Sequence, residues 1–172
     1  MFLLAGAELR AVDDRALEEL LARTEMTVAA GAEEIRGLAA AALLFADYAV
    51  LDARATLHVD VAEAWAAAAW RLGHGALRLY VKLHRDRRTT FSAADAKNAG
   101  LCDEVIEGDP HDWLHSWMAG RSTVALDSAA MLIRARGGDA LERTEFARLF
   151  AIGEPQRGLA AFLNRRSIPP QG

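Results

Sequence analysis

The stretch Phe91–Val105 constrains the fold more than any other part of this sequence. Ser92 is a residue type that caps helix N-termini, and Gly100 is the residue type expected just after a helix ends. A short helix is therefore expected over residues 93–99. The apolar run that follows, residues 101–106, predicts a strand. The sequence thus predicts the helix-to-strand connection of an α/β protein.

Further elements are expected on both sides of this connection. Short strands are predicted at residues 27–30, 48–51 and 56–59. Helices are predicted at residues 13–23, 37–46, 62–72 and 77–84, with a loop at 31–36. From Pro110 onward the pattern is helical, with helices expected at residues 112–119, 124–135, 140–151 and 156–164. We therefore predict a mixed α/β part over residues 1–109 and a helical part over residues 110–172.

Composition narrows the classes of protein to which the chain can belong. With 172 residues and 52% hydrophobic content, the chain can bury one sizeable core. A net charge of −4 and a pI near 5.7 argue against a nucleic-acid surface, and the basic cluster at residues 78–88 is interpreted as a solvated helix face. The single cysteine, Cys102, excludes an internal disulfide framework. No apolar run reaches the ~18 residues needed to cross a bilayer, so we expect a cytoplasmic protein without a membrane partner.

Four segments, in this order along the chain, resemble signature segments of the crotonase superfamily, the enoyl-CoA hydratases and isomerases. They are Phe2–Leu9, Thr27–Asp47, Phe91–Val105 and Phe146–Arg166. The resemblance implies a ClpP-like spiral of β-β-α units, truncated at its N-terminus because the first family unit has no counterpart here. It also implies a C-terminal helical module that mediates trimerisation, giving a homotrimer or a hexamer.

The resemblance implies an oxyanion hole, which consists of two backbone N–H groups that bind a thioester carbonyl as it becomes an enolate. By position, the donors are the N–H groups of Ala7 and Leu38, although the family has glycine at the second position. The segment before Leu38 can equally be a strand–loop–helix packing unit without a ligand. Ala5 and the basic pair Arg165 and Arg166 match positions that contact coenzyme A. The two arginines can equally be cations that interact with the dipole at a helix C-terminus. The implied ligand is an acyl-CoA or acyl-carrier thioester, with coenzyme A as part of the substrate and no separate cofactor.

The carboxylates of a hydratase are missing from this sequence. Their positions fall at Ala41 and Val61, which cannot transfer a proton. Asp60 and Glu63 lie next to the second position and are candidates for an acid or base. They can equally be solvated acids at a helix start. His58, nearby, is more simply a structural histidine.

One further pattern has the spacing of a metal-ligand pair. His111 and His115 are placed to share one face of a helix. The pattern lacks a third ligand and the glutamate of a zinc-protease motif, so no metal is assigned.

Two functions remain open from the sequence. The first is an enzyme that stabilises the enolate of an acyl thioester with non-standard acid–base residues, such as an isomerase, a lyase or a decarboxylase. The second is a non-catalytic crotonase homologue that serves as an accessory or structural subunit.

Overall fold

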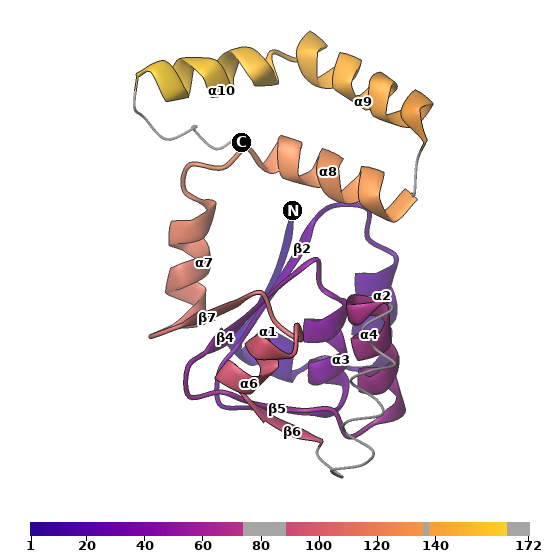
Figure 1. Ribbon diagram of the computed structural model, residues 1–172, viewed down its shortest axis with the longest axis vertical. Coiled ribbons are helices and arrows are strands. Elements are labelled where there is room, and N and C mark those ends of the chain that lie inside the picture. Colours follow the sequence, from indigo (N-terminus) through magenta and orange to yellow (C-terminus); the bar gives the residue numbers. More distant parts are fainter. Residues whose placement is uncertain (74–88, 136–137, 165–172) are drawn as a thin grey trace. The chain divides into compact units, whose positions relative to one another are not determined.

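The computed structural model describes residues 1–73, 89–135 and 138–164, which divide into two compact units. The larger unit comprises residues 3–23 and 27–113. The smaller unit comprises residues 1–2 and 24–26 together with the chain from Leu114 onward. Figure 1 traces the order of the elements along the chain. No helix in these described ranges is long and apolar enough to cross a membrane.

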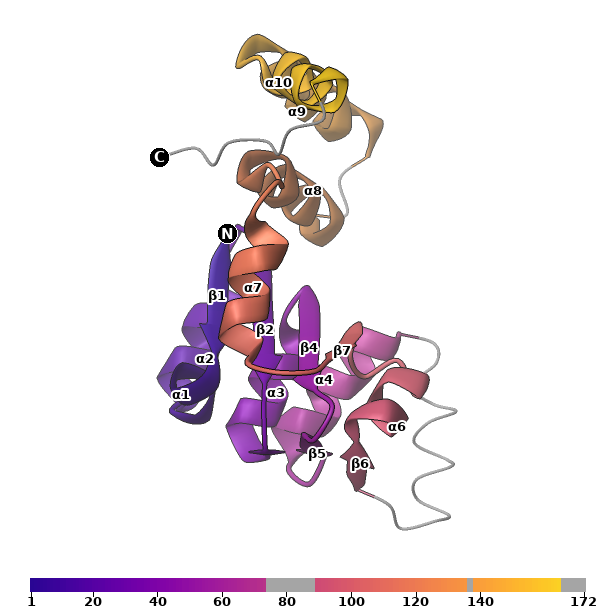
Figure 2. The same ribbon diagram turned by 90° about the vertical axis from the view of Figure 1, so that its left-hand side faces the viewer.

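The strands of the larger unit form two sheets. The four-stranded sheet has the order β1-β2-β4-β7, and its strands β2, β4 and β7 run parallel (Figure 2). The three-stranded sheet has the order β3-β5-β6, with β3 parallel and β6 antiparallel to β5. The strands are β1 (Phe2–Ala5), β2 (Thr27–Gly31), β3 (Glu34–Ile35), β4 (Tyr48–Asp52), β5 (Thr56–His58), β6 (Thr90–Ser92) and β7 (Glu104–Ile106).

Strands and helices of this unit repeat as β-β-α units. β2 of the large sheet is followed by β3 of the small sheet and then by a helix, and β4 and β5 repeat the same order. The helices are α1 (Gly6–Arg10), α2 (Asp14–Leu21), α3 (Gly37–Phe45), α4 (Ala62–Leu72) and α6 (Ala93–Asn98). The repeat agrees with the predicted α/β class and its β-β-α units.

Helix α3 is the centre of the core. Six consecutive residues, 39–44, are buried, so this helix is apolar on every side, as expected of a helix enclosed by protein. It packs most extensively against α4. Fully buried alanines such as Ala40, Ala41 and Ala67 carry only a methyl group, which lets the two backbones approach closely.

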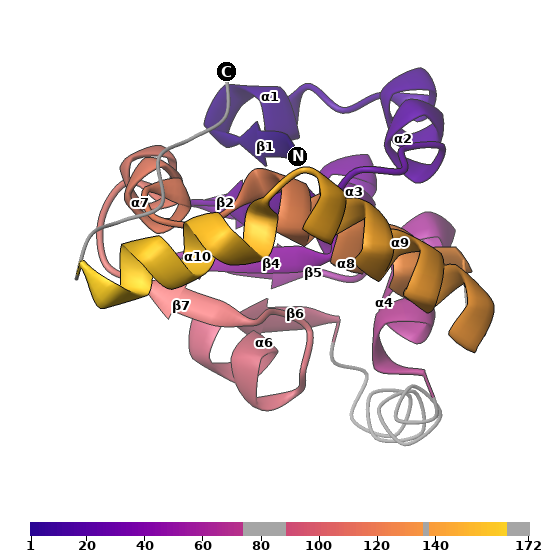
Figure 3. The same ribbon diagram turned by 90° about the horizontal axis from the view of Figure 1, so that it is seen from above.

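The smaller unit is helical. Its elements are the C-terminal part of α7 (Pro110–Met118), α8 (Thr123–Ala135), α9 (Asp139–Ala151) and α10 (Glu154–Leu163). Figure 3 shows α9 leading into α10 almost in line. Between α8 and α9, Glu145 accepts hydrogen bonds from the Ser128 hydroxyl at 2.6 Å and from Arg148 Nε at 2.9 Å. These bonds hold the pKa of Glu145 at about 2, with the Arg148 hydrogen bond as the larger cause.

Two expected boundaries differ from the structure. Residues 31–36, predicted as a loop, contain the short strand β3, because Glu34 and Ile35 pair with Thr56 and Leu57 of β5. The strand expected from Leu101 begins only at Glu104, where pairing with β4 starts. A buried apolar residue such as Leu101 looks the same in sequence whether or not it pairs in a sheet. The helix predicted at residues 77–84 and the basic cluster lie outside the described residues.

Candidate active site

The first predicted donor, the N–H of Ala7, lies in the first turn of α1. Gly6 begins the helix directly after β1 with φ +54°. This is a left-handed backbone value, which glycine adopts without steric cost. Ala5 is the N-cap residue, and its side chain makes no capping hydrogen bond. Because the first N–H groups of a helix have no partner within the helix, the turn that carries Ala7 presents backbone donors without a side-chain acceptor at its cap.

The second predicted donor, the N–H of Leu38, has the same surroundings. Gly37 begins α3 one residue after β3 with φ +59°, and the intervening N-cap residue Arg36 makes no side-chain capping bond. Two other helices of this unit are capped: Asp13 accepts from the N–H of Ala16, and Ser92 accepts from that of Asp95. A capping side chain is thus missing at both predicted donors, as it is at α4, whose N-cap residue Val61 makes no capping hydrogen bond either.

Helices α1 and α3 contact each other, and both contact β2. Their approach depends on the missing side chain of Gly31, which ends β2. A Cβ built on Gly31 would lie 2.1 Å from Ile35 Cδ1 and 3.4 Å from Leu9 Cδ2. Leu9 and Ile35 are each only 1% exposed. Gly31 therefore provides the space in which the α1 helix and the strand leading into α3 come together.

Side chains around the two donors differ in exposure. Ala7 is exposed, whereas Ala5 and Leu38 are half-buried. The family resemblance leads one to expect a glycine at Leu38; leucine adds a side chain there and keeps a backbone N–H. Neither N–H is tested as a ligand donor by the structure, and both stay predictions.

The structure places the two residues to which the resemblance assigns the hydratase carboxylates. Ala41 is fully buried inside α3, and Val61 is the half-buried N-cap residue of α4. Asp60 and Glu63 lie on either side of that cap, and both are exposed. Glu63 is in the first turn of α4, where a carboxylate interacts favourably with the helix dipole. This placement fits solvated acids at a helix start, and a role in proton transfer stays a prediction for both.

His58 lies at the end of β5, beside the same helix start. Its Nδ1 is 3.2 Å from Thr90 Oγ1, and its Nε2 is buried without a hydrogen-bond partner among the described residues. His111 and His115 are both exposed on α7. Within the described ranges, no three His, Cys, Asp or Glu side chains are grouped as a metal site would require.

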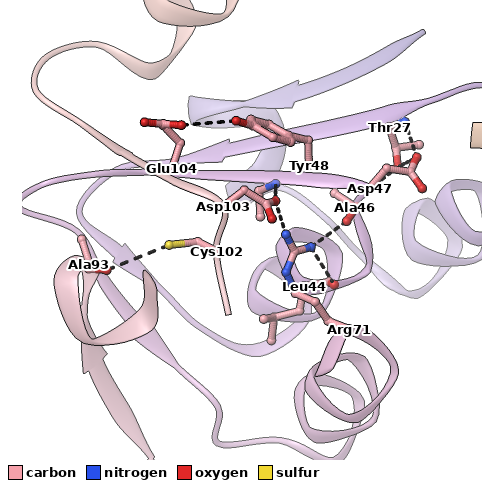
Figure 4. Close-up of polar contacts among 11 residues, drawn as sticks. Thr27, Leu44, Ala46, Asp47, Tyr48, Arg71, Ala93, Cys102, Asp103 and Glu104 are labelled. Atoms are coloured by element: carbon pink, nitrogen blue, oxygen red, sulfur yellow. Dashed lines mark hydrogen bonds and ion pairs between the residues drawn. The ribbon is translucent and has the colours of Figure 1, made fainter. Parts of the chain in front are cut away.

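The opposite end of α3 is held by Arg71, a residue to which no sequence motif draws attention. Its Nη1 donates to the carbonyl of Ala46 at 2.8 Å and to that of Leu44 at 3.5 Å, and its Nη2 pairs with the Asp103 carboxylate (Figure 4). A cation at a helix C-terminus satisfies carbonyls that lack partners within the helix. Nearby, burial raises the pKa of Cys102 to about 11, with the charge of Asp103 as a lesser cause, so this thiol is no nucleophile at neutral pH.

A second residue that sequence reasoning does not place in a site is Glu33. Among the described residues, it is the non-glycine residue with a positive φ, +61°. Its carboxylate lies 3.2 Å from Arg10 Nη1 of α1. Its φ value cannot be read from the sequence, because glutamate seldom adopts a left-handed backbone. The basic pair predicted to contact coenzyme A, Arg165 and Arg166, lies outside the described residues.

Comparisons with known proteins establish the fold. No family model matches the sequence, and no curated protein matches it. Solved structures do match. An enoyl-CoA hydratase/isomerase family protein from Hyphomonas neptunium is 22% identical with a TM-score of 0.67, over 90% of this chain and 64% of that one. An enoyl-CoA hydratase/isomerase from Mycobacterium abscessus is 22% identical with a TM-score of 0.71, over 95% of this chain and 68% of that one. An enoyl-CoA hydratase from a Polaromonas species is 22% identical with a TM-score of 0.65, over 91% of this chain and 66% of that one.

These matches define the fold of the chain. The described residues form the α/β fold of the enoyl-CoA hydratase/isomerase structures, so the predicted crotonase fold is confirmed. The chain spans about two thirds of the length of these relatives. At 22% identity these similarities establish the fold and do not identify the reaction.

Proposed function

We propose that this chain binds an acyl-CoA or acyl-carrier thioester and stabilises its enolate through the backbone N–H groups of Ala7 and Leu38. The observation that supports it is the pair of uncapped helix starts, each opened by a glycine with positive φ, on two helices that contact each other. Donors fixed in advance toward developing negative charge contribute roughly 3 kcal/mol each to catalysis. Fixed backbone donors of this kind need no side-chain chemistry.

Hydration of a double bond is not the proposed reaction. A hydratase needs two groups to position water and move its proton, and the corresponding positions here hold Ala41, buried in the core, and Val61. Isomerisation or decarboxylation suits the site better. In a decarboxylation the C–C bond to the departing CO2 supplies the electron pair of the enolate, so no base is required.

A titration with thioesters tests this proposal. Acetyl-CoA and crotonyl-CoA should bind with dissociation constants between micromolar and millimolar, measured by calorimetry, and should raise the melting temperature of the protein. Free coenzyme A, which lacks the thioester carbonyl, is the matched control and should bind more weakly. The absence of both heat and a thermal shift with either thioester would contradict the proposal.

The same proposal includes self-assembly through the C-terminal helices. Helices α9 and α10 carry large apolar side chains that are 45–79% exposed, namely Phe146, Phe150, Leu159, Phe162 and Leu163. Burying such side chains stabilises an assembly by roughly 25 cal/mol per Å² of apolar surface. We propose a homotrimer or hexamer with contacts beyond ~1,000 Å², the size of a specific interface. Light scattering after size exclusion should give three or six times the chain mass of 18.6 kDa.

A second candidate function is an accessory subunit without catalysis. It is favoured by Leu38 at the second donor and by Ala41 in the core, because both replacements weaken a site while leaving the fold intact. Co-purification in fixed ratio with a catalytically competent crotonase would support it. A homo-oligomer alone that turns over a thioester would contradict it.

A further inference from the structure

The C-terminal end of α3 is held by one side chain of α4. Arg71, in the last turn of α4, donates from Nη1 to the Ala46 carbonyl at 2.8 Å and to the Leu44 carbonyl at 3.5 Å. Its Nη2 pairs with the Asp103 carboxylate, and Figure 4 shows these contacts meeting at one guanidinium group. The Arg71 side chain is only 8% exposed. Its position is therefore fixed, because a displaced guanidinium would be a buried cation without partners.

Asp103 connects this arrangement to the large sheet. Its carboxylate accepts a hydrogen bond from the N–H of Ala49 at 2.7 Å, and its own N–H donates to the Ala49 carbonyl at 2.8 Å. Ala49 belongs to β4, which lies between β2 and β7 in the sheet. An inner strand thus sets the position of Arg71, and Arg71 in turn sets the position of the carbonyls at the end of α3.

Side-chain packing between α3 and α4 offers little resistance to a movement of α3 along its own axis. Residues 39–42 of α3 are four consecutive buried alanines, and the residues that α4 buries are also alanines. Helices interlock through ridges of side chains, and ridges made of methyl groups are shallow. At the other end of α3, the N-cap residue Arg36 makes no side-chain capping bond. The hydrogen bonds of Arg71 therefore contribute most to where α3 lies along α4.

We propose that Arg71 is a positioning residue for the N–H of Leu38, the second proposed oxyanion donor. This rests on the proposed function. Leu38 and Leu44 are six residues apart on α3, which is about 9 Å along the helix axis, so Arg71 acts through the helix and not on the ligand. A helix of this length moves as a rigid body, so a shift of its last carbonyls moves the Leu38 N–H equally. A misplacement of about 1 Å caused far from the reacting atoms can cost about 100-fold in rate.

A comparison of two ligands separates positioning from a merely structural role. Acetyl-CoA carries the thioester carbonyl that the donors would bind, whereas free coenzyme A lacks it, so the ratio of the two affinities depends on the donors. Calorimetry measures both affinities. Infrared spectroscopy of acetyl-CoA labelled with carbon-13 at the carbonyl measures the stretching frequency of the bound carbonyl, which falls when its hydrogen bonds strengthen.

Three variants complete the experiment. Arg71→Met removes the cation and all its donors. Arg71→Lys keeps the charge, but an ammonium group lacks the planar fork with which Arg71 binds carbonyls and a carboxylate together. Arg148→Met is the matched control in the smaller unit, because it removes an arginine that also pairs with a buried carboxylate, that of Glu145.

We expect the parent to prefer acetyl-CoA to free coenzyme A and to lower the carbonyl frequency. Arg71→Met should lose at least half of the frequency shift and about tenfold of the preference, while its affinity for free coenzyme A stays within about threefold of the parent value. Arg71→Lys should lie between these two proteins. Arg148→Met should melt at a lower temperature and keep the frequency shift and the preference of the parent.

An Arg71→Met protein with the frequency shift and preference of the parent overturns the proposal. Equal losses of affinity for both ligands also overturn it, because they indicate a structural role alone. If Arg71→Met does not fold, an Arg71→Lys protein with the parent values overturns the proposal instead. A parent that shows neither preference nor frequency shift refutes the proposed function itself, and the positioning role with it.

Discussion

Substitution of Gly31 by alanine should destabilise the protein through a steric clash in the core. The new Cβ would lie 2.1 Å from Ile35 Cδ1 and 3.0 Å from Ile35 Cγ1, well inside contact distance. Ile35 is 1% exposed, so its side chain has little room to rotate away. Overpacking of this kind costs about 1–3 kcal/mol, and we expect about 2 kcal/mol for Gly31→Ala. In a chain of this length that corresponds to a drop in melting temperature of roughly 4–8 °C.

A double-mutant cycle with Ile35→Val identifies the cause. Valine lacks Cδ1, the atom nearest to the new methyl group, so Gly31→Ala should cost about 1 kcal/mol less in the Ile35→Val background than in the parent. Gly37→Ala is the contrasting control, because a Cβ there meets nothing within 4 Å and the cost arises only from φ +59°. Urea unfolding followed by circular dichroism measures all four variants. A Gly31→Ala protein within about 0.5 kcal/mol of the parent, or a cycle without coupling, would refute this reasoning.

Three other predictions concern one side chain of the larger unit and two of the smaller unit. Arg71→Met should lower stability by about 2 kcal/mol, the order of cost for polar groups left unsatisfied. The substitution leaves the α3 carbonyls and the Asp103 carboxylate without their cation; thermal unfolding measures the loss, and an unchanged midpoint would contradict it. The lowered pKa of Glu145, about 2 against an ordinary value of 4.5, stabilises the protein above pH 4.5, and this stabilisation should disappear as the pH falls toward 2. Glu145→Gln should flatten that part of the stability profile, and a parallel acid transition in both proteins would exclude the assignment. Phe150→Asp should dissociate the proposed oligomer to a monomer in light scattering, whereas a parent that is already monomeric would rule out the assembly.

The larger part of the fold could be predicted from the sequence because its signals are local. Ser92 and Gly100 mark the ends of α6, and Ser92 does accept the capping bond from Asp95. The uninterrupted apolar run of α3 predicts a buried helix, and the alanine-rich run at residues 62–72 predicts α4. Propensity, capping and hydrophobic pattern depend on neighbours in the chain, so they can be read without a structure.

The resemblance found in the sequence also implies that the two hydratase carboxylates are replaced. Ala41 and Val61 have no group that can transfer a proton, whatever the fold places around them. Gly37 indicates where the backbone turns into a helix, and the structure gives it a positive φ; the short helix α1, which begins at Gly6 with a positive φ of its own, was not predicted. The substrate and the reaction do not follow from these residues, because backbone donors bind any carbonyl of suitable shape.

Only the tertiary structure revealed the contacts that join distant segments. Leu9, Gly31 and Ile35 come from three elements, and their close packing depends on the pairing of β3 with β5. A strand of two residues is too short to be predicted from the sequence pattern. Two further features could be seen only in the tertiary structure. They are the hydrogen bond from Arg71 to the Ala46 carbonyl at the end of α3 and the positive φ of Glu33. Side-chain identity is a local property, whereas the partner of a long side chain and the φ of a loop residue are set by packing among elements far apart in the chain.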